Sequence, residues 1–90
     1  IGDGIMNMRA GDLTFAHVQA YVDDLVAVPD EAMAKAVGWL FRNARLVAEP
    51  SGAASTAAVM LGLGAPVGTV VAIVSGGNVQ PDHFAQYITS

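Results

Sequence analysis

The stretch of sequence that decides the fold class is Val70-Val71-Ala72-Ile73-Val74-Ser75-Gly76-Gly77-Asn78-Val79. Residues 69–74 have the length of a β-strand and are apolar on both faces, which is typical of a central strand in a parallel sheet covered by helices. In open α/β sheets, ligands bind beyond the carboxyl ends of the strands, so Ser75 marks a candidate site. The two glycines allow positive φ and the close approach of a ligand. The alternative interpretation is a tight turn that Ser75 and Asn78 bridge.

Helical periodicity and breaker residues outline the rest of the chain. The clearest pattern is an apolar stripe at helical spacing, formed by Met33, Val37, Leu40, Phe41 and Ala44. Gly62 and Gly64 are expected to end a helix of small residues that begins near Pro50. The predicted elements are a loop at 1–12, a helix at 13–22, a strand at 25–28, a helix at 30–44, a helix at 50–61, a strand at 69–74 and a helix at 81–88. This order indicates the α/β class.

The composition is unusually apolar for so short a chain. Apolar residues make up 53% and charged residues 13% of the 90 residues, whereas about a quarter is usually charged. No apolar stretch reaches the roughly 20 residues of a membrane-spanning helix, so we expect other protein to cover the apolar faces. Two short strands are too few for a doubly covered sheet, since sheets average about 5–6 strands. Together with a start at Ile1 and no signal-peptide pattern, this predicts a fragment of a larger domain.

Charge and residue usage exclude several classes of function. The net charge of -4, with four cationic side chains, argues against nucleic-acid binding. The absence of cysteine fits a reducing compartment, and we expect a cytoplasmic location without membrane attachment. His17 and His83 share no metal-ligand pattern and are interpreted as helix-surface histidines. Asp23 and Asp24 are expected to point to opposite faces, which makes them a poor acid/base pair.

Four segments together resemble the C-terminal part of the serine/threonine dehydratase and serine racemase family, which are pyridoxal-phosphate enzymes of fold type II. The segments are Gly2-Asp3-Gly4 with Gly11-Asp12-Leu13-Thr14-Phe15, Val22-Asp23-Asp24 with Glu31, Leu46-Val47-Ala48-Glu49-Pro50-Ser51-Gly52-Ala53, and Ser75-Gly76-Gly77-Asn78-Val79. Their order and spacing match over nearly the whole chain. The resemblance implies a three-layer sheet domain of the tryptophan-synthase-β-like fold. Residues 1–90 are then one C-terminal segment of the large cofactor-binding domain, without an internal boundary.

The resemblance implies roles for five residues around the cofactor, pyridoxal 5'-phosphate. Ser75 resembles the serine that hydrogen-bonds the pyridine nitrogen, and Gly76 beside it belongs to the same wall. A neutral hydroxyl does not hold a proton on that nitrogen as a carboxylate does, which suits β-elimination. Glu49 resembles the glutamate near the ring, although it can also serve as a carboxylate at a helix start. Gly4 matches the loop glycine of the cofactor site beside the substrate, and Asn7 lies near substrate-binding positions.

Two parts of the family's site have no match in this chain. The family carries its cofactor on a lysine of an N-terminal segment and binds the phosphate in a glycine-rich loop. Lys35, the only lysine, is interpreted as a solvated helix lysine, and residues 62–64 are too short for a phosphate loop. No catalytic residue and no metal site are therefore expected here, and the chain alone is expected to be inactive. Departures from the family pattern at Gly2, Ala16 and Pro29 affect packing rather than chemistry.

Three hypotheses of function follow from these observations. The first is part of a dehydratase that converts L-serine or L-threonine to a 2-oxo acid and ammonia. The second is an amino-acid racemase of the serine racemase type, because racemisation begins with loss of the same α-proton. The third is a non-catalytic oligomerisation domain that uses the small-residue helix at 53–58. The expected partners are the N-terminal remainder of the same enzyme, a small amino-acid substrate and further copies of the chain.

Overall fold

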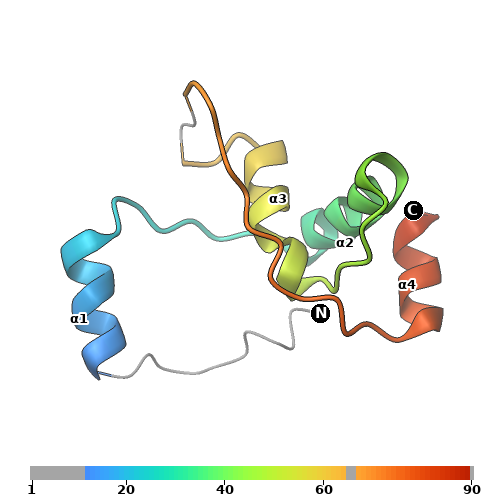
Figure 1. Cartoon of the computed structure of the whole chain (residues 1–90), viewed down its shortest axis with the longest axis horizontal. Helices are drawn as coiled ribbons and strands as arrows, with labels where there is room; N and C mark the ends of the chain where they lie inside the picture. Colours follow the sequence, from blue (N-terminus) through green and yellow to red (C-terminus); the bar gives the residue numbers. More distant parts are fainter. Residues whose placement is uncertain (1–11, 65–66, 90) are drawn as a thin grey trace.

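The computed structural model describes residues 12–64 and 67–89, so most of the expected N-terminal loop lies outside the described residues. The elements are helical throughout this part of the chain (Figure 1). They are α1 (Asp12–Tyr21), α2 (Asp30–Trp39), the π-helix η2 (Leu40–Ala44), the 3-10 helix η3 (Ser51–Ala53), α3 (Ala54–Met60) and α4 (Pro81–Ile88). The four helices expected from periodicity are therefore confirmed to within a few residues, with the third beginning as a 3-10 turn.

The core lies where α2 packs against α3 and α4. Its buried residues are Met33, Ala36, Val37, Leu40, Ala48, Ala53 and Ala57. The stripe predicted on α2 accounts for much of this core, but Ala44 at its end is exposed. The wider π-helical turn of η2 changes the residue spacing, which carries Ala44 off the buried face. Ala36, which is fully buried, adds a small residue to the buried face of α2.

Helix α4 is attached to α2 and η2 by three kinds of contact. The ring of Phe84 meets that of Phe41 edge-on, with centroids 5.2 Å apart and planes at 88°. Arg42 Nη1 donates a hydrogen bond of 2.9 Å to the carbonyl oxygen of Ile88, which gives the last turn of α4 a cationic partner. Gly38 allows this approach, because a Cβ there would lie 2.8 Å from the carbonyl oxygen of Tyr87.

The two segments expected to be strands are not paired as strands. Residues 25–28 and 70–74 run as drawn-out chain, Thr69 lies in a bend, and the described residues contain no β-strand (Figure 1). A strand requires hydrogen bonds to a neighbouring strand. The backbone nearest to residues 73–76 is instead the turn at 49–52, which supplies isolated hydrogen bonds. The helical part of the α/β pattern is confirmed, whereas the three-layer sheet stays a prediction.

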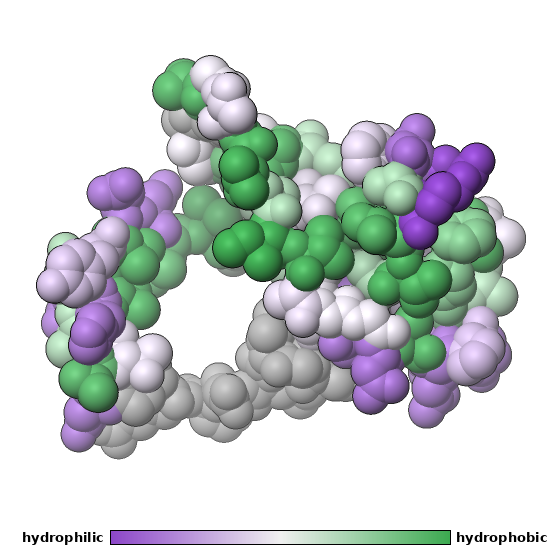
Figure 2. All heavy atoms as spheres, in the orientation of Figure 1, coloured by the Kyte–Doolittle hydropathy of each residue, from purple (hydrophilic) through white to green (hydrophobic). Residues whose placement is uncertain are grey.

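Large apolar side chains are exposed along the extended segment and on α1. Val71 is 82% exposed and Ile73 is 74% exposed, and Figure 2 shows apolar atoms gathered along this part of the chain. Helix α1 lies apart from α2, α3 and α4 in Figure 1 and contributes no buried residue. The apolar surplus in the composition is therefore left on the surface of the described residues rather than buried. None of the helices described is long and apolar enough to cross a membrane.

Candidate functional site

The site is a corner where two segments distant in sequence come together. One is the turn at 49–52, which includes the first two residues of η3, and the other is the end of the extended segment at 73–77. The backbone amide of Glu49 donates to the carbonyl oxygen of Gly76 over 3.0 Å, and the amide of Ser75 donates to the carbonyl oxygen of Gly52 over 3.3 Å. These two bonds join the sequence motifs around Glu49 and Ser75, which are about 25 residues apart along the chain.

Glycine is required at residues 52 and 77 because the two backbones approach so closely, and at residue 76 it leaves room for the Glu49 side chain. A Cβ on Gly52 would lie 2.6 Å from the amide nitrogen of Gly76, and a Cβ on Gly77 would lie 2.5 Å from the carbonyl oxygen of Val47. A Cβ on Gly76 would overlap with the carboxylate oxygen Oε1 of Glu49. Neither Gly76 nor Gly77 adopts positive φ. The glycine pair therefore serves the contact between two parts of the chain, rather than the left-handed backbone that the sequence allowed.

The two polar side chains of this corner that the resemblance assigned to the cofactor site are Ser75 and Glu49. Ser75 is exposed, and its hydroxyl makes no hydrogen bond to another described residue. Glu49 is half-buried, and its carboxylate lies against the backbone of Gly76. Glu49 also directly precedes Pro50, the N-cap of η3, so its carboxylate lies at a helix start as well as at the corner. The two interpretations of Glu49 are compatible with this position.

Several other residues singled out in the sequence lie away from this corner. Gly4 and Asn7 are outside the described residues, so their expected roles stay predictions. Lys35 is exposed on α2, as expected for a solvated lysine. His17 Nδ1 lies 2.8 Å from the carbonyl oxygen of Leu13 within α1, and His83 is exposed on α4. Among residues 12–64 and 67–89, no group of three or more histidine, cysteine or acidic side chains could hold a metal ion.

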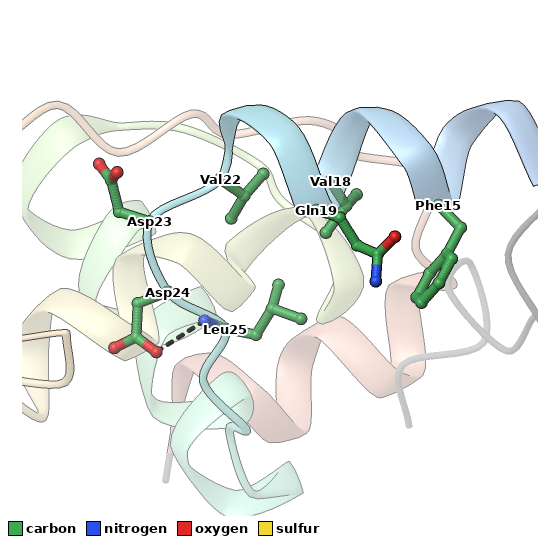
Figure 3. A pocket seen from close by; sticks show the side chains of 7 residues that line it. All are labelled: Phe15, Val18, Gln19, Val22, Asp23, Asp24 and Leu25. Carbon is green, nitrogen blue, oxygen red and sulfur yellow. Dashed lines mark hydrogen bonds between the residues drawn. The ribbon is translucent and has the colours of Figure 1, made fainter.

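An open hollow of about 380 Å³ lies beside α1, away from Ser75. Figure 3 shows its lining residues, which are Phe15, Val18, Gln19, Val22, Asp23, Asp24 and Leu25. The carboxylates of Asp23 and Asp24 point away from each other in this view, as expected for adjacent residues in an extended segment. Asp24 accepts a hydrogen bond of 2.8 Å from the amide of Leu25, which gives it a local structural role.

Comparison with known proteins identifies the family of the chain. The family described as pyridoxal-phosphate dependent enzyme matches residues 1–76, and the chain belongs to this family. The match includes both Glu49 and the Ser75-Gly76 end of the extended segment. Members of the family depend on pyridoxal phosphate, which agrees with the expected cofactor. No solved structure matches the chain significantly.

Among individual proteins, the chain is similar to ammonia-lyases and dehydratases. It is 43% identical over 79 residues to an L-threonine ammonia-lyase of Thermotoga maritima, covering 88% of this chain and 20% of that protein. It is 33% identical over 90 residues to an L-threo-3-hydroxyaspartate ammonia-lyase of Saccharomyces cerevisiae, covering 99% of this chain and 28% of the relative. Over 55 residues it is 47% identical to a biosynthetic L-threonine dehydratase of Pasteurella multocida, covering 61% of this chain and 11% of that protein. The chain thus spans between a tenth and three tenths of these relatives.

The geometry of the corner fits one side of a pyridoxal-phosphate site. The backbone contacts hold residues 75–77 in one place, so the backbone that carries the exposed hydroxyl of Ser75 has a defined position. A ring nitrogen accepts or donates one hydrogen bond, and the hydroxyl can do either. The half-buried carboxylate of Glu49 is the nearest acidic group identified at this corner.

One contact at the corner had no signal in the sequence. Ser55 Oγ donates a hydrogen bond of 2.5 Å to the carbonyl oxygen of Ile73, two residues before Ser75. Ser55 lies in a helix of small residues, where serine and alanine fit the pattern equally well. Only its spacing of three from Gly52, which puts the two residues on one side of a helical turn, could have indicated a shared partner.

Proposed function

We propose that this chain forms one wall of the cofactor pocket in an L-serine or L-threonine dehydratase, which eliminates water from a β-hydroxy amino acid and releases a 2-oxo acid and ammonia. The observation that carries the proposal is the corner itself. The exposed hydroxyl of Ser75 and the carboxylate of Glu49 are held together by hydrogen bonds between residues 49–52 and 75–76. The relatives named above, which are ammonia-lyases and dehydratases, support elimination over racemisation.

The roles of the residues follow from their chemistry. When bound, pyridoxal phosphate supplies an electron-withdrawing ring that stabilises negative charge at the α-carbon of the amino acid. The hydroxyl of Ser75 bonds the ring nitrogen without fixing a proton on it, because a neutral hydroxyl lacks the charge that holds a pyridinium ion. Glu49 keeps the pocket polar beside the ring. Because Gly76 has no side chain, the Glu49 carboxylate can pack directly against its backbone. Gly4 and Asn7 belong to the same proposal as the contacts near the substrate.

The chain needs the remainder of the enzyme for activity. We place the lysine that carries the cofactor, and the phosphate-binding loop, in the part of the relatives that this chain does not span. The exposed apolar side chains at Val71 and Ile73 support a surface that the remainder covers. By contrast, Ala53 and Ala57 are buried within this chain, so the small-residue helix offers little support for a free oligomerisation surface. Homo-oligomer formation and a cytoplasmic location stay predictions.

The test uses the full-length protein that contains this chain. Ser75→Asp places a carboxylate where the hydroxyl stands, and we expect a changed absorbance of the bound cofactor together with slower release of the 2-oxo acid from L-threonine. Thr69→Asp is the matched control, because it adds the same charge to an exposed residue at the other end of the extended segment. If Ser75→Asp leaves both the absorbance and the rate of β-elimination at the values of Thr69→Asp, Ser75 does not contact the cofactor and the proposal is wrong.

A further inference from the structure

The direction of the Ser75 hydroxyl depends on the register of the extended segment. Exposure alternates along residues 71–76, with Ile73 and Ser75 exposed and Val74 partly buried against the core. Because successive side chains of an extended chain point to opposite sides, a slip by one residue would turn Ser75 inward and Val74 outward. No neighbouring strand sets this register within the described residues. Among the described residues, contacts with residues 52–55 hold the segment instead.

Two residues on one helical turn provide that contact. Gly52 and Ser55 are three apart, which places them on the same side of the turn from η3 into α3. The carbonyl oxygen of Gly52 accepts the amide of Ser75 over 3.3 Å, and the hydroxyl of Ser55 donates to the carbonyl oxygen of Ile73 over 2.5 Å. The two bonds bracket Val74, so the segment is held on both sides of the side chain that enters the core.

We propose that Ser55 is a positioning residue that sets the register of residues 73–75 and so keeps the Ser75 hydroxyl directed outward. The inference deepens the proposed function, on which its link to the cofactor rests. Ser55 is only half-buried and its side chain reaches the backbone of Ile73 rather than Ser75 itself. It therefore acts through the backbone. Residues at the junction of η3 and α3 are thus the hydrogen-bonding partners of residues 73–75, with the Ser55 hydroxyl as one of the donors.

The first measurement is independent of the cofactor. In the full-length protein without pyridoxal phosphate, Ser55→Ala should accelerate hydrogen exchange at the Ser75 amide by roughly threefold to tenfold, the loss expected for one hydrogen bond. Ser55→Thr keeps a hydroxyl and should restore slow exchange. The control is Thr89→Ala, which removes a hydroxyl that bonds the carbonyl oxygen of Ala85 within α4. Unchanged exchange at Ser75 in Ser55→Ala, or no rescue by threonine, would overturn the inference.

The second measurement links Ser55 to Ser75. In the loaded enzyme, Ser55→Ala should raise the dissociation constant of the cofactor by roughly threefold to tenfold. The double variant with Ser75→Ala should bind no more weakly than Ser75→Ala alone, because Ser55 acts only by placing Ser75. If the two losses multiply, Ser55 acts independently and the inference is wrong. If Ser75→Ala has no effect on the dissociation constant or the spectrum, the proposed function fails, while the exchange experiment still decides the role of Ser55 in the register.

Discussion

Gly52→Ala is the sharpest test of how the corner is built. The added methyl group would lie 2.6 Å from the amide nitrogen and 3.0 Å from the carbonyl carbon of Gly76, where ordinary contacts begin at 3.4 Å. The methyl group would also overlap with the carbonyl oxygen of Gly76, so the two segments must separate by at least about 0.8 Å, since backbone atoms on both sides leave no flexible side chain to move aside. This opening strains two hydrogen bonds that join the segments, one from the Glu49 amide to the Gly76 carbonyl and one from the Ser75 amide to the Gly52 carbonyl.

The expected cost follows from these contacts. Two weakened backbone hydrogen bonds at about 1 kcal/mol each, with about 1–2 kcal/mol of overpacking, lower the local free energy of opening by about 3–4 kcal/mol. Hydrogen exchange at the amides of Glu49 and Ser75 in the full-length protein should then accelerate by roughly 150-fold to 1,000-fold. We also expect weaker cofactor binding, because Ser75 moves with the backbone.

Substitutions at Gly62 are the control that distinguishes steric overlap from backbone strain. Gly62 has φ of 71°, and nothing lies within 4 Å of the position that an added methyl group would take, so substitutions there act through the left-handed backbone alone. Asparagine tolerates this backbone better than alanine, so Gly62→Asn should be milder than Gly62→Ala. At Gly52 the order should reverse, because the larger side chain overlaps more. If Gly52→Asn is as mild as Gly62→Asn, or if exchange at Ser75 is unchanged in Gly52→Ala, the steric explanation is wrong.

Two further predictions concern α4 and the lysine. Phe84→Leu keeps an apolar side chain but loses the edge-on contact with Phe41, and should destabilise the attachment of α4 by about 1 kcal/mol, measured as faster exchange of the amides of α4. Unchanged exchange would mean that this ring pair does not hold α4. Lys35→Gln should leave the cofactor attached at its usual occupancy, measured by borohydride reduction and mass spectrometry of the labelled peptide, because Lys35 is exposed on α2. Cofactor reduced onto the peptide that contains Lys35 in the parent protein would contradict this assignment.

Much of the local structure could be predicted because its signals are local. The stripe at Met33, Val37 and Leu40 predicted a buried helix face, and the three residues are buried. Gly62 and Gly64 were expected to end a helix, and both adopt the left-handed backbone after α3. Such features depend on residues within one or two turns of each other, so periodicity and breaker residues are sufficient to locate them.

The strands and the glycine corner could not be predicted in the same way. A strand exists only with a partner backbone, and the apolar pattern of residues 69–74 does not say whether the partner lies in the chain. The glycines at 76 and 77 suggested positive φ and a nearby ligand, whereas the structure shows that they admit Glu49 and Val47. Motif resemblance indicated that Glu49 and Ser75 share a site, but the contacts that join them were not visible in either motif.

By itself the sequence determined where the helices begin and end, which face of α2 is buried, and, through its motifs, the family of pyridoxal-phosphate dependent enzymes. The tertiary structure alone decided that the turn at 49–52 closes on residues 75–77, and that Ser55 contacts the backbone of Ile73. The physical reason is the distance along the chain over which each interaction acts. Helix propensity and apolar periodicity act between neighbours, whereas the position of Ser75 depends on hydrogen bonds and close contacts between backbones far apart in the chain.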